Sequence, residues 1–169
     1  MGTGDAPTTG PGESGPRIPP PVVAAAAAGA QLVLARGRRS TRASRAAAVV
    51  LAGAATGLLG GAAAALHRRR TTLSPHTPAA TTSLVRSGPF GLSRNPIYLG
   101  IAGLLLAHAT ARRSALAVLP AVAFVIVLDR TQVPAEESAL QVRFGAAFDE
   151  YVRRVPRWVG VPGPRRREG

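Results

Sequence analysis

One run of 21 residues without a charged side chain, 46–66, constrains the fold more than any other feature of the sequence. An α-helix rises 1.5 Å per residue, so about 20 apolar residues match the hydrocarbon core of a bilayer. Three shorter charge-free runs accompany it, at 22–35, 97–111 and 114–128. Arginines at their ends extend such segments by snorkelling to the interface. The pattern predicts an all-α, polytopic membrane protein with about four transmembrane or membrane-embedded helices; for 97–128 a re-entrant hairpin is the alternative.

The charge of the chain also indicates a membrane environment. The 169 residues carry a net charge of +13, and all 21 basic residues are arginine. Such a balance indicates either an anionic membrane surface or nucleic acid as a partner. Because the arginines alternate with long uncharged runs, we expect membrane lipids and no nucleic acid. The chain has no cysteine, which excludes disulfides and thiolate metal sites, and the spacing of its three histidines predicts no metal site.

The chain divides into three parts. Residues 1–21 are rich in Gly, Pro, Ser and Thr and are predicted to be a disordered tail. Residues 22–160 are the predicted membrane domain, and 161–169 form a basic C-terminal tail. If all four segments cross the bilayer, one side receives seven arginines and the other, with both tails, receives fourteen. The positive-inside rule then places the second side in the cytoplasm.

A first polar cluster, SGPFGLSRNPIYLG, lies at 87–100, directly before an apolar run. Asn95 is predicted to cap a helix with its side-chain oxygen, and Pro96 suits the first helical position, where no N–H is needed. Gly88 and Pro89 mark a turn. On local grounds the cluster is adequately explained as the start of a helix.

A second polar cluster follows the last apolar run. Pro134 suits the first turn of a helix, and Glu136 and Glu137 would be favoured there by the helix dipole. Four apolar residues recur at helical spacing and predict a C-terminal amphipathic helix at the membrane surface: Leu140, Phe144, Phe148 and Tyr151. The residues that follow suit an interfacial anchor: Arg153, Arg154, Arg157 and Trp158. Helix formation and membrane anchoring are enough to explain this cluster too, without a catalytic role.

Taken together, the two clusters resemble the signatures of the isoprenylcysteine carboxyl methyltransferase and phospholipid methyltransferase family, most closely its short bacterial members. The first signature resembles G-P-[FY]-x-x-x-R-[HN]-P-x-Y-x-G and is carried by Gly88, Pro89, Phe90, Arg94, Asn95, Pro96, Tyr98 and Gly100. The second resembles a Glu-Glu pair followed by Leu, Phe-Gly, Tyr and Val-x-Arg-Trp, carried by Glu136, Glu137, Leu140, Phe144, Gly145, Tyr151, Val155, Arg157 and Trp158. The segments IPPP at 18–21 and TTLSP at 71–75 add to a resemblance that covers roughly residues 17–160.

The resemblance implies S-adenosylmethionine as the methyl donor and a lipophilic acceptor, either of the isoprenylcysteine-carboxylate type or a lipid amine. It implies a helical membrane site without a Rossmann sheet, in a bacterial cytoplasmic membrane and facing the cytoplasm. The residues expected to bind the donor are Gly88, Pro89, Arg94, Asn95, Pro96, Tyr98, Gly100, Glu136 and Glu137.

The catalytic candidates are Glu137, Arg130 and Arg154. An arginine fork would orient an acceptor carboxylate, whereas an acceptor amine would need a glutamate as base. The chain departs from the family pattern at Asn95, where many members have His, and at Gly91, where many bacterial members have Arg.

Two other readings stay open at this point. A non-catalytic membrane scaffold or partner subunit would keep the same fold without methyl transfer. A basic protein of the membrane surface or of nucleic acid is disfavoured by the even spread of arginine around apolar runs. The identity of the acceptor and the oligomeric state are left open by the sequence.

Overall fold

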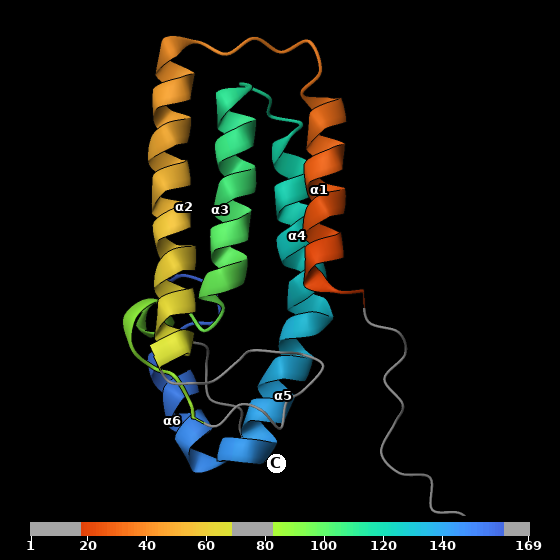
Figure 1. Ribbon diagram of the computed structural model, residues 1–169. Helices are drawn as coiled ribbons and strands as arrows, with labels where there is room; N and C mark the ends of the chain where they lie inside the picture. The colour runs from red at the N-terminus through yellow and green to blue at the C-terminus, as the bar shows by residue number, and fades with distance from the viewer. Residues whose placement is uncertain (1–17, 69–82, 161–169) are drawn as a thin grey trace, which may run out of the picture.

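The described part of the chain is entirely helical. A computed structural model describes residues 18–68 and 83–160, and no strand occurs among them (Figure 1). The elements are α1 (Pro20–Leu34), α2 (Arg42–Arg68), the short 3₁₀-helix η2 (Gly88–Gly91), α3 (Pro96–Ala111), α4 (Val118–Arg130), α5 (Gln132–Phe144) and α6 (Ala146–Arg154). The prediction of an all-α protein is confirmed. The tails at 1–17 and 161–169 and the TTLSP segment at 71–75 lie outside the described residues.

Each of the four charge-free runs forms a helix. α2 covers all of 46–66, and α3 begins at Pro96, as the missing N–H of proline predicts. α1 begins at Pro20, slightly before the predicted start and inside the segment predicted to be a tail. α4 begins only at Val118, because the hydroxyl of Ser114 accepts a hydrogen bond from the N–H of Ala117 and holds a turn there.

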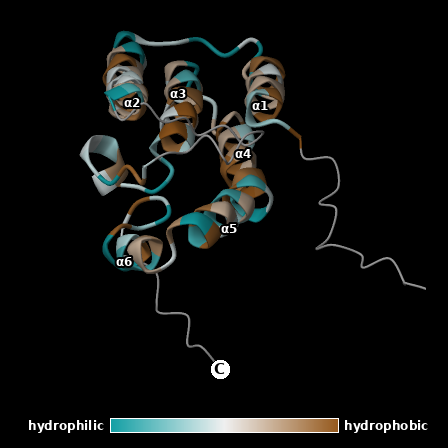
Figure 2. Cartoon of the chain, turned by 60° about the horizontal axis from the view of Figure 1, so that its bottom comes forward, coloured by the Kyte–Doolittle hydropathy of each residue, from teal (hydrophilic) through white to brown (hydrophobic). Residues whose placement is uncertain are grey.

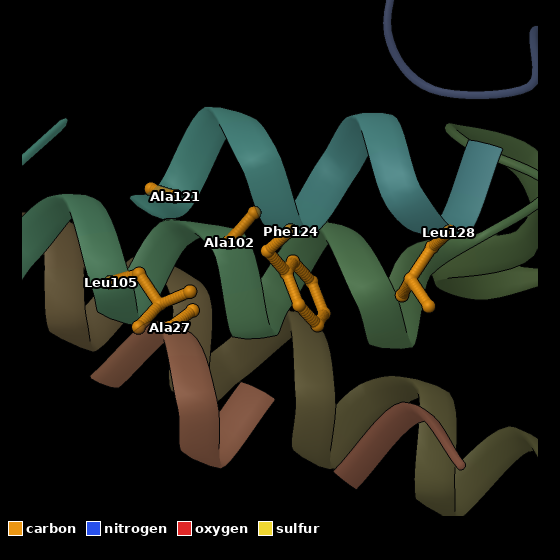
Figure 3. Packing of buried hydrophobic residues seen from close by; sticks show 6 residues of the cluster. All are labelled: Ala27, Ala102, Leu105, Ala121, Phe124 and Leu128. Carbon is orange, nitrogen blue, oxygen red and sulfur yellow. The ribbon is translucent and has the colours of Figure 1, made fainter. Parts of the chain in front are cut away.

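Helices α1 to α4 lie side by side, with α3 packed against α2 on one flank and against α4 and α1 on the other (Figure 1). The main core joins α1, α3 and α4 and consists largely of small residues around one aromatic ring (Figure 3): Ala27, Ala102, Leu105, Ala121, Phe124 and Leu128. At the α2–α3 contact a Cβ on Gly100 would lie 2.6 Å from Leu59 Cγ and 3.1 Å from the backbone oxygen of Ala55. Close backbone approach through small residues is typical of helix packing in membranes.

The outward faces of these four helices are apolar. Large exposed hydrophobic side chains occur on each of them: Val22, Leu32 and Val33 on α1, Val49 and Val50 on α2, Leu104 and Leu106 on α3, and Leu119, Val122 and Ile126 on α4. Hydrophilic residues recur instead along α5 and α6 (Figure 2). Two stretches, Arg42–Arg68 and Val118–Phe144, are long and apolar enough to span a membrane by length and composition. The fold is therefore an all-helical bundle with two helices of membrane-spanning length.

The predicted C-terminal amphipathic helix is wrong as a single element. Gly145 adopts φ 47° and ψ −126°, a conformation that favours glycine, and there the chain breaks into α5 and α6. α5 follows α4 after Thr131 alone and begins before Pro134, so no acidic residue lies in its first turn. The helix dipole therefore does not explain the position of Glu136 and Glu137. The apolar residues expected on one face still gather, in a cluster of Phe148, Tyr151 and Val155 with Leu84, Leu140, Phe144 and Val152.

Both polar clusters lie at one end of the bundle. The α1–α2 and α3–α4 connections share the far end, whereas the start of α3, the end of α4 and both α5 and α6 lie at the near end (Figure 1). The alternation of helix direction, inferred from four successive segments, thus brings 87–100 and the C-terminal region together. This shared end is where the candidate site lies.

Candidate functional site

A carboxylate held between two guanidinium groups forms the centre of the site. Glu137 Oε1 lies 2.8 Å from Arg94 Nη1 and accepts a 3.1 Å hydrogen bond from Arg157 Nε. Arg157 Nη2 donates to the other oxygen of the same carboxylate. The Arg94 and Glu137 side chains are 9% and 18% exposed, so this contact is largely shielded from water. Each charge is compensated by an opposite charge, as a buried ion pair requires.

Asp129, at the end of α4, extends this network. Its Oδ1 accepts from Arg157 Nη1 at 3.1 Å and from Trp158 Nε1 at 2.8 Å. Arg157 thereby bridges two carboxylates that come from α4 and α5. The sequence predicts Arg157 and Trp158 to belong to an interfacial anchor, and in the structure both side chains are half-buried and bond within the site.

Glu136 has a separate set of partners. Tyr98 donates its hydroxyl proton to Glu136 Oε1 at 2.6 Å, and Gln132 Nε2 donates to the same oxygen at 2.8 Å. No described residue donates to Oε2. Tyr98 lies in the first turn of α3, so this bond joins α3 to α5 beside the central ion pair. The adjacent glutamates thus differ: one oxygen of Glu136 is left for another donor, whereas both oxygens of Glu137 are occupied.

Backbone contacts fix the two motifs against each other. The carbonyl of Arg157 accepts from both Ser93 Oγ and Asn95 Nδ2, each at 3.0 Å, and the N–H of Arg94 donates to the carbonyl of Pro156 at 2.9 Å. Asn95 occupies the N-cap position of α3 but makes no side-chain cap hydrogen bond. The prediction that its oxygen caps the helix is therefore wrong, because its amide is used to hold the C-terminal segment.

Burial and ion pairing shift the pKa values of the titratable groups at this end in different directions. Burial lowers the pKa of Arg94 from its ordinary value, and the neighbouring Glu137 opposes that change. The hydrogen bond to Glu137 raises the pKa of Arg157, with Asp129 adding to the effect. Burial raises the pKa of Tyr151, whose hydroxyl donates to the carbonyl of Phe90 at 2.7 Å. Both arginines stay charged because the guanidinium group is not deprotonated in proteins, and the raised pKa keeps Tyr151 a neutral donor.

Two predicted donor-binding residues serve packing. Gly100 lies against α2 at a distance that leaves no room for a side chain. Pro89 also faces α2, because a Cβ on Gly61 would come within 2.9 Å of its ring. Gly88 adopts φ 62° at the start of η2. Glycine adopts this backbone conformation more easily than other residues, which explains its presence at this position. Pro96, buried at the first position of α3, begins the helix that carries Tyr98.

The two arginines predicted to be catalytic lie outside the network. Arg154 is exposed on α6 and pairs with Glu150 at 2.6 Å. Arg130 is exposed at the end of α4 next to Asp129, and no ion pair joins it to the described carboxylates. The structure thus brings together Arg94, Asn95, Tyr98, Glu136 and Glu137 but not Arg130 or Arg154.

Sequence reasoning gave no role in the site to Asp129, Gln132 or Ser93. Asp129 ends a long apolar run, and an acidic residue at that position indicates a candidate site residue. Gln132 precedes Glu136 by one helical turn, the spacing at which side chains meet. Ser93 carries no signal that local sequence reasoning detects. Among the described residues no group of three or more His, Cys, Asp or Glu is placed to hold a metal ion.

No family model matches the chain, and neither does any curated protein or solved structure. The resemblance to membrane methyltransferases therefore depends on the two motifs and on the way they meet.

Proposed function

We propose that this protein is an integral membrane methyltransferase that uses S-adenosylmethionine and acts on a lipophilic acceptor, either of the isoprenylcysteine-carboxylate type or a lipid amine. The observation that carries the proposal is the contact between the two signature motifs. Arg94 from the first motif meets Glu137 from the second, and Tyr98 meets Glu136 beside it. Residues that resemble one family's signature in two distant segments converge at one end of the bundle.

The proposed membrane placement has four embedded helices, α1 to α4, with the site at the cytoplasmic side of a bacterial cytoplasmic membrane. The apolar outer faces of all four helices support it. α3, with 16 residues, rises only about 24 Å, so Arg112 and Arg113 after its C-terminal end would reach the interface by snorkelling. Among the described residues, eight arginines lie toward the site end and seven at the opposite end, and this small excess favours the cytoplasm for the site end.

The donor has a methionine carboxylate, and the site has matching groups. Arg94 Nε is buried without a hydrogen-bond partner. Next to it, α3 begins without a side-chain cap, so its first N–H groups point to a position where an anion is favoured. Arg94 and the start of α3 would therefore hold the carboxylate of the donor.

The amine or the ribose hydroxyls of the donor need an acceptor, and Glu136 Oε2 is the oxygen left for them. Tyr98 and Gln132 fix the other oxygen and so orient the carboxylate. When bound, S-adenosylmethionine supplies a methyl group activated by its sulfonium. The protein's part is to align donor and acceptor, which supplies much of the reduction of the barrier in a displacement at carbon.

The role of Glu137 follows from its partners. Because both of its oxygens are bonded to guanidinium groups, it positions Arg94 and Arg157 and is poorly placed to take a proton. Arg157, held by two carboxylates, keeps the C-terminal motif against α3.

Titration of S-adenosylhomocysteine into the detergent-purified protein tests the proposal. We expect binding in the micromolar range and a loss of about tenfold or more in Glu136→Gln, since a hydrogen bond to a charged group contributes roughly 1.5–3 kcal/mol. Glu150→Gln is the matched control: it changes the same residue type in a half-exposed pair with Arg86 and Arg154, away from the network. Absence of binding in a folded helical sample, or equal losses in both variants, would contradict the proposal.

One observation favours a non-catalytic scaffold as a second candidate. Arg94, Arg157, Asp129 and Glu137 compensate one another within the protein, so the network already has a structural role. If the protein is a scaffold, the wild-type protein and Glu136→Gln would both fold, and neither would bind S-adenosylhomocysteine.

A further inference from the structure

The end of the bundle opposite the site carries a dense group of arginines, which we name the arginine end. Its members come from the two connections and the helix starts and ends beside them: Arg36, Arg38, Arg39, Arg42 and Arg45, with Arg112 and Arg113. All are exposed except Arg112, which is half-buried. Hydrogen bonds bring the two connections together, since Arg38 Nη2 donates to the carbonyl of Arg113 at 3.1 Å. Ser44 Oγ also donates to the carbonyl of Ala111 at 3.2 Å.

No carboxylate compensates this charge within the described residues. Their five acidic residues, Asp129, Glu136, Glu137, Asp149 and Glu150, all belong to the end of α4, to α5 or to α6. The 13 residues of α4 alone separate the two ends by about 20 Å, which exceeds the Debye length of roughly 8 Å at physiological ionic strength. None of the described salt bridges includes an arginine of the arginine end. Within the described residues these seven positive charges are therefore uncompensated and accessible to an anionic partner.

Apolar side chains lie immediately next to these charges. Leu32 and Val33 are 65% and 67% exposed in the last turn of α1 before Arg36. Val49 and Val50 are 70% and 72% exposed one turn beyond Arg45 on α2. A belt of exposed hydrophobic residues below a layer of arginines matches the boundary between acyl chains and phosphates in a bilayer.

We infer that the arginine end binds the phosphate groups of anionic phospholipids. Guanidinium groups bind phosphate oxygens in a bidentate manner, and the exposed belt lies where the acyl chains of the same lipids would pack. The cross-connection bonds of Arg38, together with the 3.5 Å bond from Arg112 Nη2 to the carbonyl of Ala35, hold the two connections in one surface. This inference depends on membrane insertion but not on methyl transfer.

The test compares lipid binding in nanodiscs made of equal parts phosphatidylglycerol and phosphatidylcholine, with retained lipids counted by native mass spectrometry. The variant R36Q/R39Q/R42Q/R45Q removes four charges and keeps Arg38 and Arg112, which hold the connections. We expect the wild-type protein to retain phosphatidylglycerol preferentially and the variant to lose that preference by at least about tenfold, because each basic residue near an anionic surface adds to the attraction.

The matched control is R68Q/R86Q/R153Q/R154Q, which removes four exposed charges at the other end of the bundle. It should keep the preference for phosphatidylglycerol. Equal losses in the two variants would overturn the inference, since only total charge would then matter. Equal retention of both lipids by the wild-type protein would overturn it as well. Circular dichroism of both variants verifies the fold, and titration of S-adenosylhomocysteine on the same samples separates a failure here from a failure of the proposed function.

Discussion

Arg94 Nη1 and Glu137 Oε1 lie 2.8 Å apart and join the connection before α3 to the second turn of α5. Neither side chain has much access to water, and Arg157 contacts the same carboxylate from the C-terminal segment. The fold of the site end depends on this three-group arrangement, because removing one charge would leave another poorly compensated. Its strength can be measured separately from any activity.

Replacing Arg94 with Met keeps an unbranched apolar side chain, shorter than that of arginine, and removes the charge. We expect the free energy of unfolding to fall by about 3 kcal/mol, since breaking a buried pair leaves a charge without its partner. Unfolding in mixed micelles can be followed by the fluorescence of Trp158, the one tryptophan, whose indole N–H donates to Asp129. Arg86→Met is the control: its contact with Glu150 is 3.6 Å long and about 40% exposed, so its loss should be below about 1 kcal/mol. Similar losses in the two variants would show that the central pair adds no special stability.

Tyr98→Phe tests whether the orientation of Glu136 matters for binding. The change removes the 2.6 Å hydrogen bond to Glu136, and we expect about 1 kcal/mol less stability together with roughly fivefold weaker binding of S-adenosylhomocysteine. Tyr151→Phe removes a comparable hydroxyl bond, to the carbonyl of Phe90, outside the donor contacts. It should lower stability to a similar extent and leave affinity unchanged. A parallel fall in affinity for both variants would assign the effect of Tyr98 to stability alone.

Gly100→Ala tests the close approach of α2 and α3. The new Cβ would lie 2.6 Å from Leu59 Cγ and 3.1 Å from the backbone oxygen of Ala55, so we expect a loss of about 1–3 kcal/mol. Gly57→Ala, in the middle of α2, meets nothing within 4 Å. That variant should be unchanged or more stable by up to about 1 kcal/mol, because alanine favours the helix. Thermal unfolding in detergent measures both, and a stable Gly100→Ala protein would mean that the two helices separate easily.

A polar pair of buried Gln31 and half-buried His108 ties α1 to the α3–α4 hairpin. Gln31, 1% exposed, donates to the carbonyls of Leu105 and Ala117 at 3.0 and 2.6 Å, and its oxygen lies 3.1 Å from His108 Nδ1. His108 is thus a packed and hydrogen-bonded residue.

A double-mutant cycle with Gln31→Leu and His108→Leu measures that contact. Interhelical hydrogen bonds in membranes average about 0.6 kcal/mol, and we expect a coupling energy of that size. The measurement is the free energy of unfolding of the wild-type protein, both single variants and the double variant. Strictly additive effects would show that the two side chains act independently.

The sequence predicted the site in part. Arg94, Asn95, Tyr98, Glu136 and Glu137 were named from two motifs, and all five meet at one end of the bundle. Their placement follows from counting: four helices in succession alternate direction, so the segment before α3 and the segment after α4 share an end. Ser93 was missed, because its partner, the carbonyl of Arg157, lies in a distant segment and is recognised only when the distance between the segments is known.

The sequence by itself determined the helices, since charge-free runs and prolines act locally on the backbone and on burial. It also determined that both motifs share an end. Only the tertiary structure decided which groups pair. Asn95 was predicted to cap α3 and instead donates to the carbonyl of Arg157, and Gly145 divides a segment that reads as one helix. The physical reason is that periodicity describes a residue's own helix, whereas a hydrogen bond between distant segments depends on how those helices pack.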